Sequence, residues 1–396
     1  MTRDSTRPDS ESRRKFILSL GALGAGALAG CSGGGDTTTA QPAANTEDDS
    51  NDATVTATAT QTATPTATQT TTEEQMTTTT TQQQETGPLE SGGSSTVYPV
   101  AEDAAAYWNA NRPADDTEYW PHGEYGIDTD LRLADYWASL YGFEPDDNKK
   151  PPFRWTVGLS HSGTGVRNVR DGVYDIGNSS GNVEAELPER DSYEKFTDHV
   201  VAVDGQPLVV SSEIKEAGVT GITGQQLKDL YKGRITNWSE LGGPDRDIRV
   251  LGRVRDSGTR TSFVSNVFGN PTEDTQVANR YGQNQRLAQA VAQADNAISY
   301  LALAFLGTNG VEPISLEWEG TTYSYQDPQN GLDSRDYPLS RDLHMYTWEG
   351  TSMKEAAVIN MMLSQFGQDT FVAPNNYFTL GERRLEKQRA KLPDQV

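Results

Sequence analysis

The 396-residue chain has few of the side chains that catalytic and metal sites most often use. It contains one cysteine, Cys31, so a disulfide within the chain is excluded. There are four histidines, His122, His161, His199 and His344, and none lies in a Cys/His spacing typical of a metal site. A Walker motif, a dinucleotide fingerprint and a nucleophile elbow are also missing. We therefore expect no enzyme and no cofactor.

One histidine invites a comparison with catalytic triads. His161 stands between Ser160 and Ser162, and a serine hydroxyl next to a base is the usual nucleophile of a hydrolase. Neighbouring residues on a strand or loop point apart, however, so His161 could not easily activate either serine. We predict a solvated or capping loop residue at this position.

Basic residues are scarce as well. The chain has 33 lysines and arginines against 56 aspartates and glutamates, a formal net charge of −23. No basic patch or stripe of the kind found in nucleic-acid binders occurs, so we predict no nucleic-acid partner. The acidic excess continues through residues 93–396 and is not confined to a tail. Such a charge keeps a folded protein soluble in concentrated salt, which predicts a salt-loving organism; an ordinary acidic protein is the alternative. We expect a lipoprotein of a halophilic archaeon.

Residues 1–30 have the pattern of an export signal. Arg13 and Arg14 precede the apolar residues 16–29, which are fewer than the ~20 needed to span a bilayer. The sequence LAGC that ends at Cys31 resembles a lipobox, in which the cysteine is lipidated and becomes the new N-terminus. We predict twin-arginine export, lipidation of Cys31, and a lipid anchor at the extracellular face of the cell membrane.

Residues 31–92 form a threonine-rich segment with no aromatic residue. A segment so poor in apolar side chains cannot bury enough surface to fold. Stretches rich in Ser, Thr and Pro are often O-glycosylated stalks. We predict a disordered linker that holds the folded part away from the membrane.

Beyond residue 92, apolar segments with strand and helix patterns alternate, which is typical of an α/β fold. Residues 109–150 fit this alternation poorly and are interpreted as an insertion. The predicted strands are 153–159, 173–177, 199–212, 247–254 and 339–346; the predicted helices are 101–108, 131–141, one starting at 166, one capped by Thr223, 354–365, and one at the C-terminus.

Four short segments of serine, threonine and glycine lie between a predicted strand and a predicted helix. They are residues 93–96, 160–164, 178–181 and 257–259. A helix N-terminus offers free N–H groups and the positive end of the helix dipole, and hydroxyls add directed donors. An arginine nearby can add a charge-assisted pair. Serine at a helix start is usually only a cap, but four such segments together indicate an anion site.

The motifs around these segments resemble a known family. GSSTVYPVAEDAA, YDIGNSS, the run from LKDLYKGRITNW to RVRDSGTRTSF, NAISYLAL and YPLSRDLHMYT resemble, in this order, the phosphate-binding proteins of ABC-type phosphate importers. The resemblance covers about residues 92–390, with a gap at 109–150. It implies a two-lobed periplasmic-binding-protein (type II) fold with a hinge.

The resemblance also implies an organisation and a set of partners. The lobes would comprise residues 93–203 and 339–396 for lobe I and residues 204–338 for lobe II. Inorganic phosphate would bind between them and be delivered to the membrane permease subunits of an ABC importer. We expect a monomer. The alternatives are binding of another tetrahedral oxyanion such as sulfate, phosphate sensing, and a surface adhesive role.

By position, the resemblance implies a set of phosphate-binding residues. The set is Ser95, Thr96, Val97, Ser162, Ser180, Arg253, Ser257, Gly258 and Thr259. Arg255 and Arg260 are expected to face solvent or acidic neighbours. The best-known family members have an aspartate where this chain has Ser180, and that carboxylate accepts the proton of phosphate and rejects sulfate. Asp256, or less plausibly Asp175, could supply the missing acceptor.

Overall fold

The computed structural model describes residues 87–145, 148–307 and 310–396. The predicted export signal, Cys31 and nearly all of the predicted linker lie outside these residues. By its internal contacts, the part of the chain from Gln84 onward is one compact unit. None of the helices in the described ranges is both long and apolar enough to cross a bilayer.

The first sheet has five strands in the order β2-β1-β3-β12-β4. β1 lies between β2 and β3 and is parallel to both, whereas β12 is antiparallel to β3 and β4. The bounds are β1 (Leu89–Ser94), β2 (Trp155–Ser160), β3 (Ile176–Ser179), β4 (Phe196–Gly205) and β12 (Ser340–Trp348). Leu89 is fully buried, so the folded part begins four residues before the predicted boundary at 93.

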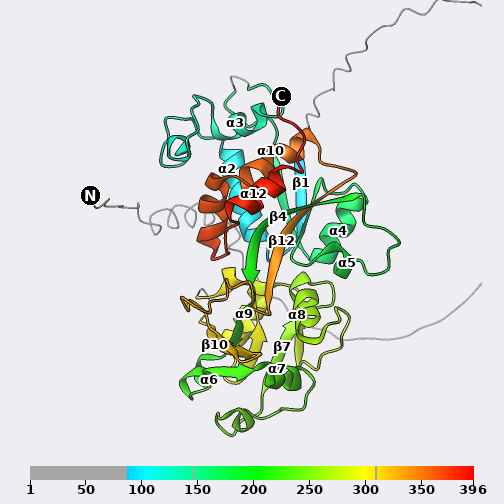
Figure 1. Ribbon diagram of the computed structural model, residues 1–396, viewed down its shortest axis with the longest axis vertical. Helices are drawn as coiled ribbons and strands as arrows, with labels where there is room; N and C mark the ends of the chain where they lie inside the picture. Colours follow the sequence, from blue (N-terminus) through cyan, green and yellow to red (C-terminus); the bar gives the residue numbers. More distant parts are fainter. Residues whose placement is uncertain (1–86, 146–147, 308–309) are drawn as a thin grey trace, which may run out of the picture. The chain divides into compact units, whose positions relative to one another are not determined.

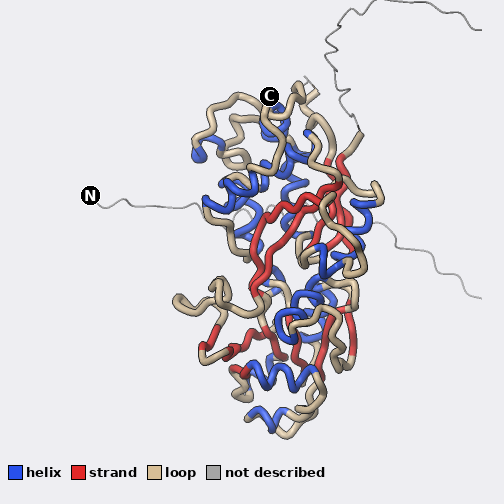
Figure 2. The backbone as a smooth tube through the Cα atoms, turned by 45° about the vertical axis from the view of Figure 1, so that its right-hand side comes forward, coloured by secondary structure: helices blue, strands red, loops and turns tan. Residues whose placement is uncertain are grey.

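The second sheet has the order β11-β10-β5-β9-β7-β8, and β6 pairs with β10. Its strands are β5 (Leu208–Val210), β6 (Gly221–Thr223), β7 (Arg249–Arg253), β8 (Asn279–Tyr281), β9 (Ala297–Tyr300), β10 (Glu312–Trp318) and β11 (Thr321–Tyr323). All of them come from the chain between β4 and β12. Figure 2 shows the strands of both sheets in red, with helices in blue packed around them.

The α-helices are α2 (Tyr98–Ala110), α3 (Leu133–Ser139), α4 (Ser162–Arg170), α5 (Val183–Glu186), α6 (Ser212–Glu216), α7 (Gly224–Tyr231), α8 (Gly258–Phe268), α9 (Asn284–Ala292), α10 (Met353–Met362), α11 (Gln365–Gly367) and α12 (Glu382–Arg389). Short turns of other helix types are η2 (His122–Tyr125), η3 (Trp238–Leu241), η4 (Leu303–Phe305), η5 (Gln368–Val372) and η6 (Ala373–Asn375). Thr223 caps α7 as predicted, in a capping box with Gln226.

Two adjacent strands, β4 and β12, connect the two sheets. They pair antiparallel along their whole length and run side by side (Figure 1). The sequence predicted one strand over 199–212, but the structure has β4 and β5 there, in different sheets. Pro207 lies between them and cannot donate a ladder hydrogen bond, which explains the break in an otherwise apolar run.

We call the first sheet with its helices the first half of the folded part, and the second sheet with its helices the second half. Residues 111–145 are packed into the first half. Trp120 is fully buried, and its ring centroid lies 5.0 Å from that of Phe366 next to α10. The predicted helix at 131–141 is the shorter α3, and Trp137 on it is 4% exposed. This segment therefore extends the hydrophobic core and is not a surface addition.

Close glycine contacts bring α4 against the first sheet. A Cβ atom on Gly93 would lie 2.3 Å from the carbonyl oxygen of Asn178, and one on Gly165 would lie 2.6 Å from the same oxygen. Gly93 also has a φ of +133°, which side chains disfavour. The helix can approach the ends of β1 and β3 because both positions are glycine.

Candidate functional site

The four Ser/Thr/Gly segments all connect a strand to a helix, as predicted. They follow β1, β2, β3 and β7 and lead into α2, α4, α5 and α8. Since β1, β2 and β3 are parallel, their carboxyl ends meet at one edge of the first sheet. The N-termini of α2 and α4 lie at this edge, and α8 brings a third from the other half. Three helix starts of useful length are thus available to an anion.

A small polar cavity lies where these segments meet, and its walls pack so closely that almost no free volume is left inside it. Its lining is Ser94, Ser95, His161, Ser162, Ser180, Arg253, Ser257, Gly258 and Thr259. Pockets for organic ligands measure roughly 300–1,000 Å³, so this cavity excludes a ligand of that size. Seven of the nine predicted binding residues are in the lining, together with Ser94 and His161. Thr96 and Val97 are not in it.

Thr96 nevertheless joins the hydroxyl network around the cavity. Its Oγ1 lies 3.0 Å from Oγ1 of Thr259, which belongs to the other half. Ser94 Oγ donates to Ser180 Oγ at 3.0 Å, and Ser180 N–H donates to Ser162 Oγ at 3.1 Å. Val97 contributes its backbone N–H, 3.4 Å from Ser94 Oγ, at the start of α2.

Gly258 allows the two halves to approach each other this closely. A Cβ atom at this position would lie 2.3 Å from Ser162 Oγ and 2.8 Å from Ser180 Oγ. Both serines belong to the first half, and Gly258 begins α8 in the second. Any side chain at 258 would therefore push the halves apart at the cavity.

Arg253, at the end of β7, is 1% exposed. Its Nε donates to the carbonyl of Tyr281 at 3.1 Å, and its Nη2 donates to the carbonyl of Gly282 at 2.7 Å. Its remaining bonds go to hydroxyls, Ser95 Oγ at 3.1 Å and Thr259 Oγ1 at 3.0 Å. Within the described ranges no carboxylate pairs with it. Burial lowers the pKa of Arg253 to about 9.

A buried cation without a counter-charge is energetically unfavourable, because desolvation is not offset. A bound anion would supply that counter-charge inside the cavity. Arg253 is therefore the strongest single indication of an anion site in this chain.

The sequence analysis missed a second arginine beside the cavity. Arg341, on β12, is bound to Asp204 on β4, with Nη2 and Nε at 2.6 Å and 2.9 Å from Oδ2. Both side chains are almost fully buried. Arg341 also donates to the hydroxyls of Thr96 and Thr259, at 3.2 Å and 3.3 Å, and so reaches both halves. Its charge is balanced by Asp204.

Asn284 is a further residue that the sequence analysis did not single out. Its Nδ2 donates to Ser95 Oγ at 3.2 Å and to Thr96 Oγ1 at 3.1 Å, while its Oδ1 is buried without a partner. It stands at the start of α9, in a segment without a serine or glycine pattern, so no local signal marked it. Its amide fixes the orientation of two hydroxyls at the cavity.

The structure places neither Asp256 nor Asp175 at the cavity. Asp256 forms an ion pair with Arg167 at 3.2 Å and is more than half exposed. Asp175 accepts a hydrogen bond from the backbone N–H of Glu90, at the opposite end of β1 from the cavity. Neither carboxylate lines the cavity, so Ser180 has no acidic substitute there.

Arg255 and Arg260, which lie near Asp256 in the sequence, differ in their exposure. Arg255 pairs with Asp274 at 2.6 Å and is two-thirds exposed, as expected. The expectation for Arg260 is wrong: it is 2% exposed and donates to the backbone carbonyl of Glu273. Its position on the inner face of α8 buries it against the loop that precedes β8.

The prediction that His161 is a solvated or capping residue is confirmed only in part, because the residue is half-buried. His161 occupies the N-cap position of α4, but its side chain caps nothing. Its ring lines the cavity, and its Nδ1 is buried without a hydrogen-bond partner. Burial, followed by the positive charge of Arg253, lowers the pKa of His161, so the ring is neutral at pH 7.

A buried carboxyl lies behind the cavity-lining loops. Glu186, at the end of α5, is 8% exposed, and its Oε1 has no hydrogen-bond partner. A Cβ atom on Gly181 would lie 2.4 Å from this oxygen. Burial raises the pKa of Glu186 to about 8, so the group is mostly protonated at neutral pH.

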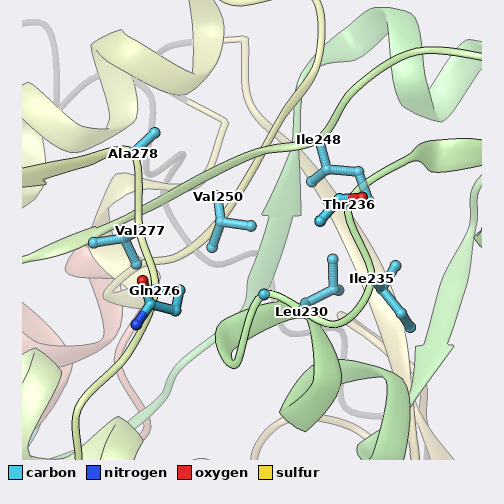
Figure 3. Close-up of a pocket in the computed structure, with 9 residues that line it drawn as sticks. Leu230, Ile235, Thr236, Ile248, Val250, Gln276, Val277 and Ala278 are labelled. Carbon is cyan, nitrogen blue, oxygen red and sulfur yellow. The ribbon is translucent and has the colours of Figure 1, made fainter.

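A second pocket in the other half has a different character. Figure 3 shows it lined by apolar and uncharged side chains such as Leu230, Val250 and Gln276. No charged side chain lines it. The pocket therefore offers nothing to balance the charge of an anion.

Two sheets joined by paired strands, with a charged cavity at the meeting point of their loops, define a two-lobed binding fold. The model of the family described as the PBP superfamily domain matches residues 140–368. This match spans more than half of the chain, and the protein belongs to that family.

Named relatives agree with this assignment. The phosphate-binding protein PstS of Bacillus subtilis (strain 168) is 28% identical over 232 residues, which are 57% of this chain and 71% of the relative. The phosphate-binding protein PstS of Borreliella burgdorferi is 26% identical over 224 residues, 54% of this chain and 76% of the relative.

A solved structure shares the fold. It is a putative phosphate ABC transporter substrate-binding protein with bound phosphate from Clostridium perfringens, with a TM-score of 0.56 and 24% identity. The match covers 74% of this chain and all of that one.

Proposed function

We propose that this protein binds inorganic phosphate outside the cytoplasm and delivers it to the membrane permease of an ABC importer. The observation that carries the proposal is Arg253, a buried arginine at a small polar cavity, which has no carboxylate partner among the residues that the structure describes. The names of the relatives from Bacillus subtilis and Borreliella burgdorferi support phosphate as the ligand.

In the proposed bound state, the guanidinium of Arg253 pairs with the phosphate. The hydroxyls of Ser95, Ser162, Ser257 and Thr259 donate to its oxygens, as do backbone N–H groups at the starts of α2, α4 and α8. Ser180 and Thr96 complete the hydroxyl set. These groups come from both halves, so the ligand stabilises the arrangement in which the halves meet.

Release requires the halves to separate, and β4 and β12 are the connection about which they would turn. A bound phosphate would shift the balance toward the closed arrangement only through bonds made there, such as those to Thr259 and Gly258 of the second half. The permease would then recognise the closed form.

The predictions for residues 1–92 complete the proposal. Export through the twin-arginine pathway, a lipid on Cys31 and a threonine-rich linker would hold a monomeric binding protein at the outer face of the membrane. The net charge of −23 opposes the approach of an anion in dilute buffer. At about 1 M salt the Debye length falls to roughly 3 Å, so a halophilic setting would remove that repulsion.

The test is a calorimetric titration of the full chain carrying Cys31→Ser, in concentrated KCl, with phosphate and separately with sulfate. Saturable one-to-one heat with phosphate is expected. Binding of sulfate with equal affinity would make the protein a general oxyanion receptor, and binding of neither anion would remove the proposal.

A further inference from the structure

A binding protein for phosphate must distinguish phosphate from sulfate, which has the same shape and a similar charge. The chemical difference is the proton that phosphate keeps at neutral pH. A group that can only accept a hydrogen bond favours phosphate, which has a proton to donate. If sulfate were bound instead, the same group would face an oxygen without a proton and repel it. Asp256 and Asp175 do not line the cavity, so the acceptor must be another group.

We infer that His161 is this specificity-determining residue: its Nδ1 accepts the proton of bound phosphate. The inference rests on the proposed function. It starts from an acceptor that is already in place, since His161 lines the cavity and its Nδ1 is buried with no partner among the described residues. A buried, unpaired ring nitrogen is unfavourable unless a ligand completes it.

The contacts of the ring favour one tautomer. The edge formed by Cε1 and Nε2 faces Gly282, because a Cβ atom there would lie 3.2 Å from Cε1 and 3.6 Å from Nε2. Hydrogen bonding to the backbone of Gly282 also contributes to the electrostatic environment of the ring. A proton on Nε2, the nitrogen on the side of Gly282, leaves Nδ1 with a free lone pair that can only accept.

The charges around the ring keep it neutral. Arg253 from β7 and Arg167 from α4 disfavour a proton on His161, whereas Asp256 from the loop before α8 favours one. Asp256 is already paired with Arg167, which weakens its influence. A neutral ring is required, because a protonated one would donate to sulfate and phosphate alike.

His161 and Arg253 would then act on the same ligand in different ways. Arg253 supplies positive charge, which both anions need equally. His161 adds an acceptor, which only phosphate can use. Selectivity for phosphate over sulfate thus comes from a histidine between β2 and α4 and does not need an acidic residue at position 180.

The first experiment compares His161→Leu with His161→Asn, two replacements of nearly the same shape. The Oδ1 of asparagine can stand where Nδ1 stands and accept a hydrogen bond, while leucine cannot. In titrations with phosphate and sulfate at pH 7.5, we expect leucine to lower the ratio of phosphate to sulfate affinity at least tenfold, the effect of one hydrogen bond to a charged ligand. Asparagine should keep the ratio within about threefold of the unsubstituted protein.

An equal ratio in the leucine variant would overturn the inference while leaving phosphate binding intact. Failure of the unsubstituted protein to bind either anion would remove both the inference and the proposed function. Equal affinity of the unsubstituted protein for both anions would overturn the inference alone and leave an oxyanion receptor.

A pH series tests the same group without any substitution. The pKa of His161 is lowered, so discrimination should be complete at neutral pH and fall as the ring takes up a proton under acidic conditions. Sulfate affinity should therefore rise with acidification in the unsubstituted protein and stay flat in His161→Leu. A parallel rise in both proteins would contradict the role of His161.

The tautomer can be observed directly, since the chain has four histidines and hence few ring signals to assign. In nitrogen-15 spectra of the protein with bound phosphate, Nδ1 of His161 should have the shift of an unprotonated nitrogen and Nε2 that of a protonated one. A proton on Nδ1 would overturn the inference even if the variants fail to fold.

Discussion

Arg253 and Arg341 are both buried beside the same cavity, but their surroundings differ. Arg341 is held by two bonds to Asp204, which also accepts the backbone N–H of Leu303. Arg253 bonds to hydroxyls and carbonyls, and no acid in the described part of the chain pairs with it. A buried arginine with its own carboxylate is part of the structure; one without a carboxylate is left available for a ligand.

The largest effect should follow from removing the partner of the balanced arginine. Asp204→Ala would leave Arg341 buried and unpaired, and breaking a buried pair in this way destabilises proteins by roughly 3–5 kcal/mol. Denaturant unfolding with and without phosphate would measure the loss. The matched control is Asp342→Ala, since Asp342 pairs with Arg384 at a half-exposed site, where the loss should be below about 1 kcal/mol. Equal losses would show that Asp204 is not needed to balance Arg341.

The converse is expected for the unbalanced arginine. Arg253→Ala should weaken phosphate binding by about 2–4 kcal/mol, through loss of a desolvated charge-assisted pair, yet leave the ligand-free protein at least as stable. Calorimetry and thermal unfolding measure the two effects. Arg255→Ala, at an exposed ion pair, should change neither. Unchanged affinity in the Arg253 variant would contradict its assignment to the ligand.

Closure of the halves can be perturbed without touching a charge. Gly258→Ala places a methyl group against Ser162 and Ser180, so phosphate affinity should fall by about tenfold or more, roughly 1.4 kcal/mol, because the two halves cannot meet fully. The control is Gly381→Ala, at a position with open space around it. If calorimetry gave equal phosphate affinities for the two variants, close approach at Gly258 would not matter for binding.

The smallest effect concerns the carboxyl behind the cavity. Burial raises the pKa of Glu186 from 4.5 to about 8 in the folded state, so stability is highest in acid, falls as pH rises from about 4.5, and levels off above about 8. Glu186→Gln should remove this dependence, raising the Tm at pH 9 by at least roughly 2 °C and leaving it almost unchanged at pH 4. A thermal scan at both values measures it; a gain that is equal at both would exclude ionisation as the cause.

Much of the cavity could be predicted from the sequence, because its lining follows a local rule. Hydroxyl and glycine residues placed after strands end up together when those strands are parallel and adjacent, as β1, β2 and β3 are. This explains why the segments that contain Ser95, Ser162 and Ser180 could be recognised from their local pattern, whereas the individual residues came from the family resemblance.

The remaining residues depend on contacts between distant parts of the chain. Asp204 and Arg341 are 137 positions apart and meet only because β4 and β12 pair. Asn284 and the ring of His161 owe their positions to loops of the second half. In the run 199–212, Pro207 marks a break, but no local pattern assigns the two ends to different sheets.

The close contact of α4 with the first sheet has a consequence for mutational tolerance. Gly93 and Gly165 touch the backbone of Asn178 and leave no room for a methyl group, although neither lines the cavity. In a saturation library selected for growth on scarce phosphate, these two positions should accept no substitution, whereas several hydroxyl residues of the cavity should accept some. The sites with the least sequence freedom would then be those that bring a helix to its ligand, and a map of intolerance would outline the scaffold more sharply than the binding site.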